Sequence, residues 1–114
     1  MNISYKNTKT AKQFVVGRSL VKIHGPRRAR LITERLIALE AAPSLAFFWP
    51  PYSKNERCHE LTTNRSGQFS MDLDHPYRLI FVPKHDPVPR RPDGGTDWQA
   101  ITDIIILGVE DTHD

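Results

Sequence analysis

The sequence has very little cysteine and no long apolar run. Cys58 is the single cysteine among 114 residues, so an internal disulfide and a thiolate metal cluster are both excluded. No apolar stretch approaches the roughly 20 residues that a transmembrane helix needs. The first residues also lack the basic start and apolar core of a signal peptide. These absences predict a cytoplasmic protein that has no contact with a membrane.

The length and composition are those of one soluble domain spanning residues 1–114. A chain of this length buries about two thirds of its unfolded surface, which suffices for one modest core. Apolar residues make up 39% and charged residues 25% of the chain, as in ordinary globular domains. We therefore expect a single domain without internal repeats.

Positive charge is concentrated at the front of the chain. Residues 1–42 contain nine Lys or Arg and two Glu, a net charge of +7. Residues 43–114 contain seven basic and eleven acidic side chains, a net charge of −4. A basic front half favours binding to a polyanion or to an acidic partner protein. A helix face that is merely solvated would explain the same charges.

The front of the chain predicts a short strand followed by helices. Residues 1–5 suit a strand, and a first helix is expected from Asn7 or Thr8 to about Val15. Two further helical stretches, 19–25 and 26–42, are separated by Gly25 and Pro26, which predicts a helix hairpin. The last stretch carries an apolar stripe that can face a core: Ala29, Ile32, Leu36 and Leu39.

The rest of the chain predicts strands. They are expected over 57–62, 68–73, 77–82 and 103–109, with a long irregular loop over 83–99. The last of these is β-branched and continuous, as in a central strand. Strands preceded by helices indicate an α+β fold, in which the helices cover one face of an antiparallel sheet.

Side-chain alternation predicts which residues face the core. Phe69 and Met71 fall on one face of their strand, and Leu79 and Phe81 fall on one face of the next. Arg78 falls on the opposite face, where it must be paired or open to water, because burying an unpaired arginine is costly.

Several polar residues can gather near Arg78. If the last strand pairs beside 77–82, Asp111 and His113 leave the sheet close to Arg78. His59 approaches from the preceding hairpin, and Arg65 stands at its tip. Taken singly, each of these residues has an ordinary explanation as a surface, turn or tail residue, and that alternative stays open.

Such a group suits one reaction in particular. RNA is cut when its own 2′-hydroxyl attacks the adjacent phosphate. The reaction needs a base for the hydroxyl proton, cations for the charged phosphorane, and an acid for the leaving oxygen. Histidine serves as base or acid near neutral pH, and arginine binds phosphate oxygens in a fork. No metal or cofactor is required.

The motifs resemble those of a known family. The stretch CHELTTNRSGQFSMDLDHPYRLIF, with VEDTH near the end, is similar to the HigB branch of the RelE/ParE toxin superfamily. The resemblance covers nearly the whole chain. It implies a RelE-like, microbial RNase-type fold with two N-terminal helices on a twisted, mainly antiparallel sheet of four to five strands. It also implies a ribosome-dependent mRNA endonuclease that is the toxin of a type II toxin–antitoxin pair.

The resemblance also implies roles for individual residues. Those expected in catalysis are His59, Arg65, Arg78, Asp111 and His113. Those expected to contact RNA are Asn64, Lys84, Thr112, Arg27, Arg28 and Arg30. The implied partners are a HigA-like, DNA-binding antitoxin, the ribosome and mRNA.

Two departures from the family pattern leave alternatives open. Thr62 stands where the family often has lysine, and Thr112 stands where the terminal motif usually has tyrosine. Threonine has no aromatic ring to stack on a base. The chain could therefore be a weakened homologue that binds a partner. A ParE-like toxin that inhibits DNA gyrase without cutting RNA is a further alternative.

Overall fold

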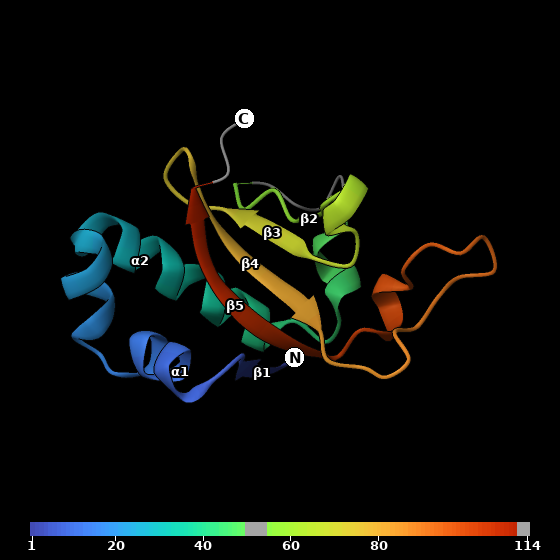
Figure 1. Cartoon of the computed structure of the whole chain (residues 1–114), viewed down its shortest axis with the longest axis horizontal. Helices are drawn as coiled ribbons and strands as arrows, with labels where there is room; N and C mark the ends of the chain where they lie inside the picture. The colour runs from blue at the N-terminus through green and yellow to red at the C-terminus, as the bar shows by residue number, and fades with distance from the viewer. Residues whose placement is uncertain (50–54, 112–114) are drawn as a thin grey trace.

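A computed structural model describes residues 1–49 and 55–111 of the chain (Figure 1). The helices are α1 (Thr8–Val15) and α2 (Ser19–Ala41), with short 3₁₀ turns η1 (Leu45–Phe48), η2 (Thr63–Arg65) and η3 (Trp98–Ala100). The strands are β1 (Asn2–Tyr5), β2 (His59–Glu60), β3 (Phe69–Asp72), β4 (Tyr77–Pro83) and β5 (Asp103–Asp111).

The strands form one sheet in the order β1-β5-β4-β3-β2. β1 is parallel to β5, and every other neighbouring pair is antiparallel. The continuous apolar strand β5 is internal to the sheet, as its sequence predicted. The predicted α+β architecture, with the helices before a mainly antiparallel sheet, is confirmed.

Capping and helix-breaking residues set the start of α1 and the break within α2. Asn7 caps α1, because its Oδ1 accepts a hydrogen bond of 2.8 Å from the backbone N–H of Thr10. The two predicted stretches after α1 are consecutive parts of α2, with a break in helical backbone at Gly25. Gly25 has φ 82°, which a glycine adopts without steric cost, and Pro26 then starts the second part.

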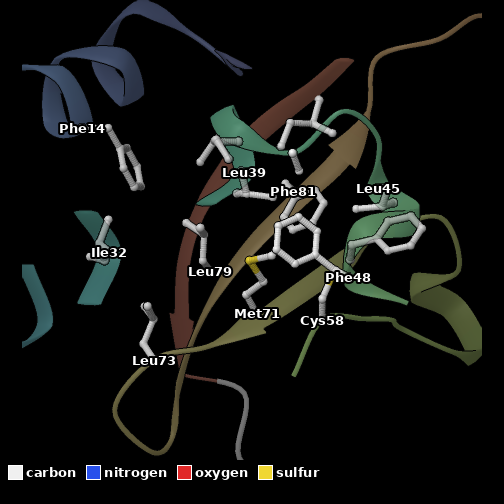
Figure 2. Packing of buried hydrophobic residues seen from close by; sticks show 14 of the residues in the cluster. Phe14, Ile32, Leu39, Leu45, Phe48, Cys58, Met71, Leu73, Leu79 and Phe81 are labelled. Carbon is white, nitrogen blue, oxygen red and sulfur yellow. The ribbon is translucent and has the colours of Figure 1, made fainter. Parts of the chain in front are cut away.

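One face of the sheet packs on the helices and forms the core (Figure 2). Ile32 and Leu39 of α2 are fully buried against Leu79 and Phe81 of β4. The ring of Phe69 stacks on that of Phe81 with centroids 5.8 Å apart. The predicted alternation in β3 and β4 is therefore confirmed. We call the opposite face of the sheet the open face, although Ser70 and Ile80 on it are fully buried.

The predicted strand over 57–62 is much shorter in the structure, where β2 is only His59–Glu60. Arg57 has φ 44° and Thr63 has φ 62°, and both values are incompatible with extended backbone. The segment after β2 then turns into η2 and leads to β3.

The segment after β4 is irregular, as predicted. Within it, the isolated bridge between Arg90 and Thr96 ties the two sides of the loop together. Trp98 of η3 packs edge-on against Phe69 in the core, with ring centroids 5.2 Å apart. In the described ranges, neither helix has the length and apolar character needed to cross a bilayer.

Candidate active site on the open face

Strand register brings polar side chains from four strands onto the open face. His59 of β2 lies opposite Ser70 of β3. Arg78 of β4 lies opposite Asp72 of β3 on one side and opposite Glu110 of β5 on the other. Residues opposite one another in a ladder share a face, so these side chains are neighbours. Ser70 and Asp72 are two residues, or about 7 Å, apart along β3.

The ring of His59 is held in one tautomer. Its Nδ1 lies 2.8 Å from the backbone oxygen of Arg57. A carbonyl oxygen only accepts hydrogen bonds, so Nδ1 carries the proton. In the neutral ring, Nε2 then has a free lone pair, and it lies 3.5 Å from the hydroxyl of Ser70. The half-buried ring is thus arranged to accept a proton at Nε2.

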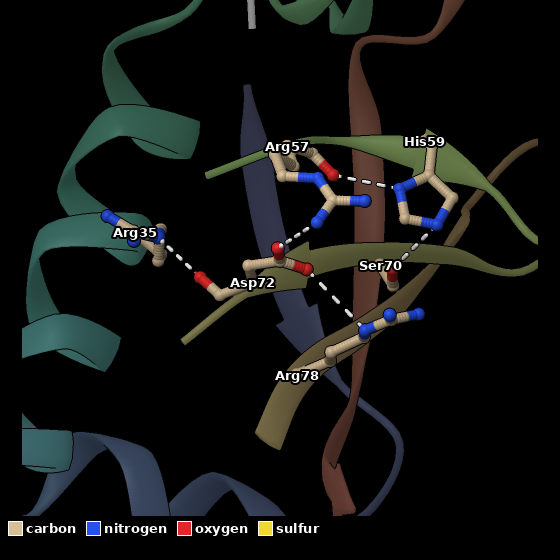
Figure 3. A network of polar contacts seen from close by, with 6 residues as sticks. All are labelled: Arg35, Arg57, His59, Ser70, Asp72 and Arg78. Carbon is tan, nitrogen blue, oxygen red and sulfur yellow. Dashed lines mark hydrogen bonds and ion pairs between the residues drawn. The ribbon is translucent and has the colours of Figure 1, made fainter. Parts of the chain in front are cut away.

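Asp72 connects two arginines on this face (Figure 3). Its Oδ2 lies 3.2 Å from the guanidinium of Arg57, and its Oδ1 lies 3.5 Å from Nε of Arg78. The backbone oxygen of Asp72 accepts a hydrogen bond of 2.9 Å from Arg35 of α2. A single carboxylate therefore forms ion pairs with two cations beside His59.

This carboxylate is unusual in one respect. Its Oδ1 is buried, and it has no hydrogen-bond partner among the described residues. A buried carboxylate oxygen without such a bond loses solvation, and here the ion pairs with Arg57 and Arg78 offset part of that loss. Two positive groups near one carboxylate leave net positive charge, which suits an anion.

Arg65 reaches the same region from the connection between β2 and β3. Its two terminal nitrogens each lie 2.9 Å from a carboxylate oxygen of Glu110, and the group also donates to Gln68. To reach β5, this side chain crosses the open face over β3 and β4. The hydrogen bonds with Glu110 raise the pKa of Arg65. Since Glu110 lies opposite Arg78, the structure brings Arg65 and Arg78 together.

The register also places Asp111, a predicted catalytic residue, relative to Arg78. Asp111 lies opposite Tyr77, and Tyr77 packs against the core. Strand alternation therefore directs the Asp111 side chain to the helix side, and Glu110 is the acid of β5 that shares a face with Arg78. Thr112 and His113, the remaining residues of the predicted terminal motif, lie outside the described residues.

The predicted RNA-contacting residues are distributed over several surfaces. Arg28 is engaged in the fold, because it forms two hydrogen bonds of 2.8 and 3.0 Å with Asp74 and stacks over the ring of Tyr77 at 3.5 Å. Lys84 follows the far end of β4, about 20 Å along the strand from Arg78, so it does not join the cluster. The others that are described, Arg27, Arg30 and Asn64, have exposed side chains.

Three residues of this cluster did not stand out in the sequence: Arg57, Asp72 and Glu110. Alternation in β3 and β5 places Asp72 and Glu110 on the face of Arg78 once the register is known. No sequence signal marks Arg57, because its position in the cluster depends on a left-handed backbone. Within the described ranges, no group of three His, Cys, Asp or Glu residues is arranged to hold a metal.

The fold has a counterpart among solved structures. No protein-family model matches the chain, and no curated protein matches it. A chain of the YoeB–YefM complex from Staphylococcus aureus superimposes with a TM-score of 0.56 and 13% sequence identity. The match covers 99% of this chain and 98% of that chain. At such low identity the likeness establishes the fold, and it confirms the RelE-like fold class that the sequence predicted.

Proposed function

We propose that this protein is the toxin of a type II toxin–antitoxin pair and acts as an endoribonuclease. Two lines of support are independent of each other. The fold is shared with a chain of the YoeB–YefM complex, which supports a toxin of the RelE superfamily. The open face also gathers a proton acceptor and several arginines. Assignment to the HigB branch is supported by the sequence motifs alone.

The single observation that carries the proposal is the convergence of His59 with Arg57, Arg65 and Arg78 on one face. Nε2 of His59 takes the proton of the RNA 2′-hydroxyl, since Nδ1 is held by the Arg57 carbonyl. The arginines stabilise the negative phosphorane. His113 protonates the leaving 5′-oxygen in this scheme.

Binding to the ribosome and mRNA is proposed to use positive surface charge. Arg27 and Arg30 are exposed on α2, and contacts of this kind to phosphate contribute affinity but little sequence specificity. Arg28 contributes mainly to stability in this scheme. The partner expected to neutralise the protein is a small antitoxin of the HigA-like, DNA-binding type.

A cell-free translation assay with primer extension on the message tests the proposal. We expect cleavage by the natural chain, and a reduction of about 10²- to 10⁴-fold in His59→Ala and about 10²- to 10³-fold in Arg78→Ala. Lys84→Ala is the matched control, because Lys84 is exposed at the far end of β4. Cleavage that is unchanged in both site variants would rule out this site.

The same preparations separate the alternative functions. Inhibition of gyrase supercoiling together with an intact message would favour a ParE-like toxin. An intact message, normal supercoiling and no growth arrest after induction would favour a weakened homologue. The ion pair that occupies Arg65 gives the latter outcome a physical basis.

A further inference from the structure

The internal strand β5 is paired on both sides along only part of its length. β1 pairs with β5 from Asp103 to Ile106, whereas β4 continues beside β5 as far as Asp111. The last hydrogen bond from the β1 side runs from the N–H of Lys6 to the oxygen of Ile106, at 3.1 Å. In the described part of the chain, no strand pairs with Leu107–Glu110 on that side.

The local sequence explains why β1 stops there. Asn7 caps α1, so the chain leaves the sheet and turns into a helix directly after Lys6. In Figure 1, β1 lies beside only the N-terminal part of β5. A strand directs the backbone groups of alternate residues to each neighbour. The segment Leu107–Glu110 therefore presents backbone donors and acceptors on the side that β1 does not reach.

A cleft of about 400 Å³ follows this exposed edge. Leu107, Gly108 and Val109 line one side of it. The other sides come from the β1–α1 connection, α1 and the first part of α2: Lys6, Asn7, Lys9, Thr10, Gln13, Phe14, Ile23 and His24. Gly108 has no side chain, and a Cβ placed there would meet no atom within 4 Å. The backbone of β5 is thus accessible from the cleft.

The lining indicates what kind of ligand fits. Phe14 and Ile23 supply apolar surface, and Lys6 and Lys9 are exposed cations at the rim. None of the described residues that line the cleft is acidic. Burial, together with the nearby charge of Arg28, lowers the pKa of His24, which disfavours its protonated form. A polypeptide with alternating apolar and acidic side chains matches the backbone edge, the apolar wall and the two lysines together.

We propose that this cleft binds an extended, acidic segment of a partner protein, which adds a strand beside Leu107–Glu110 of β5. Main-chain hydrogen bonds supply affinity in such strand addition, and alternate side chains supply specificity. The segment takes the place that β1 would occupy if it continued past Lys6. A nucleic acid backbone would use the two lysines but not the edge amides. The inference does not depend on RNA cleavage.

Peptide titrations of the full ¹⁵N-labelled chain, followed by NMR, test the inference. The probe is acetyl-(Glu-Val)₃-amide. We expect it to shift the amide signals of Leu107, Gly108 and Val109 and to slow their hydrogen exchange. The peptide with Lys in place of Glu, and the acidic peptide with alternate N-methyl amides, should each bind at least about tenfold more weakly.

Paired charge reversals provide the matched comparison. Lys6→Glu combined with Lys9→Glu should weaken binding of the acidic peptide about tenfold or more. Lys12→Glu combined with Lys22→Glu changes the net charge equally at exposed positions outside the cleft, and should leave binding unchanged.

Any of the following results would overturn the inference. The first is the absence of shifts at Leu107–Val109 at millimolar acidic peptide. The second is equal binding of the N-methylated peptide, or displacement of the acidic peptide by a uridine hexanucleotide that shifts the same amides. The third is a dependence of these signals on protein concentration alone, which would identify a second copy of the chain as the occupant. Loss of RNA cleavage in a variant has no bearing on any of them.

Discussion

The backbone oxygen of Arg57 lies 2.8 Å from Nδ1 of His59, and Arg57 itself has φ 44°. A non-glycine residue adopts such a backbone only where the surrounding structure compensates its strain. Here the strained residue supplies the acceptor that sets the histidine tautomer, while its side chain pairs with Asp72. Arg57 is therefore a positioning residue for His59 through its backbone and a cation of the site through its guanidinium.

Substituting Arg57 in two ways separates these roles. Arg57→Gly removes the cation but tolerates the left-handed backbone, so we expect slower RNA cleavage, by about tenfold or more, with the Nδ1–H tautomer retained. Arg57→Ala removes the cation and its ion pair with Asp72 but keeps the backbone strain of a residue with a Cβ, so we also expect the tautomer to change. Ring ¹⁵N chemical shifts of His59 report the tautomer directly. Identical ring shifts in all three proteins would contradict the positioning role.

In the proposed mechanism, Glu110 competes with RNA for Arg65. Its carboxylate makes two hydrogen bonds of 2.9 Å with the arginine fork, in the geometry that a phosphate would use. Glu110→Gln removes this competing charge, so we predict a several-fold lower KM for RNA. Stability should change by less than about 1 kcal/mol, because both side chains are more than a third exposed.

Steady-state cleavage kinetics and urea unfolding measure the two effects. Glu34→Gln makes the same change of charge at an exposed position on α2 and is the control. An equal decrease of KM in both variants would show that net charge alone is responsible. An increase of KM in Glu110→Gln would mean that Glu110 positions Arg65 for RNA instead of competing with it.

Arg28 illustrates how far the basic surface could be predicted. The stripe on α2 identified the buried face correctly, and Arg28 falls off that stripe together with Arg27 and Arg30. Its contact with Asp74 depends on how the turn between β3 and β4 approaches α2, a tertiary relationship that no local pattern contains. Charge alone therefore predicted three equivalent arginines, whereas the structure uses one of them in the fold.

The site was predictable to a similar extent. Alternation in β3 and β4 placed Arg78 on the face away from the core, and pairing of the last strand beside β4 puts Glu110 opposite it. The register between β4 and β5 determines which acid shares that face with Arg78, and that acid is Glu110 and not Asp111. Arginine is not a residue type that favours left-handed backbone, so the conformation of Arg57 and its contact with His59 could not be predicted.

Arg28→Ala should destabilise the fold by about 2 kcal/mol at neutral pH. The variant loses hydrogen bonds to a carboxylate and the stacking on Tyr77, and it leaves Asp74 unpaired. Arg27→Ala changes an exposed arginine next in sequence, and should lie within about 0.5 kcal/mol of the natural chain. Urea unfolding at pH 7 measures both differences, and equal effects would contradict a special role of Arg28.

The same ion pair predicts a dependence on pH. Hydrogen bonds from Arg28 lower the pKa of Asp74 below its usual value. A carboxyl group whose folded-state pKa is lowered contributes stability above its unfolded-state pKa and loses it as the pH falls through the folded-state pKa. The stability difference between the natural chain and Asp74→Asn should therefore be largest near neutral pH and disappear in strong acid. A difference that grows on acidification would contradict this assignment.

Cys58 should react with thiol reagents only when the protein opens. Its side chain is 1% exposed and belongs to the core cluster beside the site. Burial, and to a lesser extent the charge of Glu56, raises the pKa of the thiol, so very little nucleophilic thiolate forms near neutral pH. We predict that an aromatic disulfide reagent modifies the native chain only through global unfolding, and at once in 6 M guanidinium. The core variant Leu79→Ala is expected to lower the free energy of unfolding by about 2 to 5 kcal/mol. It should therefore accelerate the reaction by the factor by which it increases the unfolded population. Rapid reaction of the natural chain, or no acceleration in this variant, would show that Cys58 is reached by a local opening that leaves the core around β4 intact.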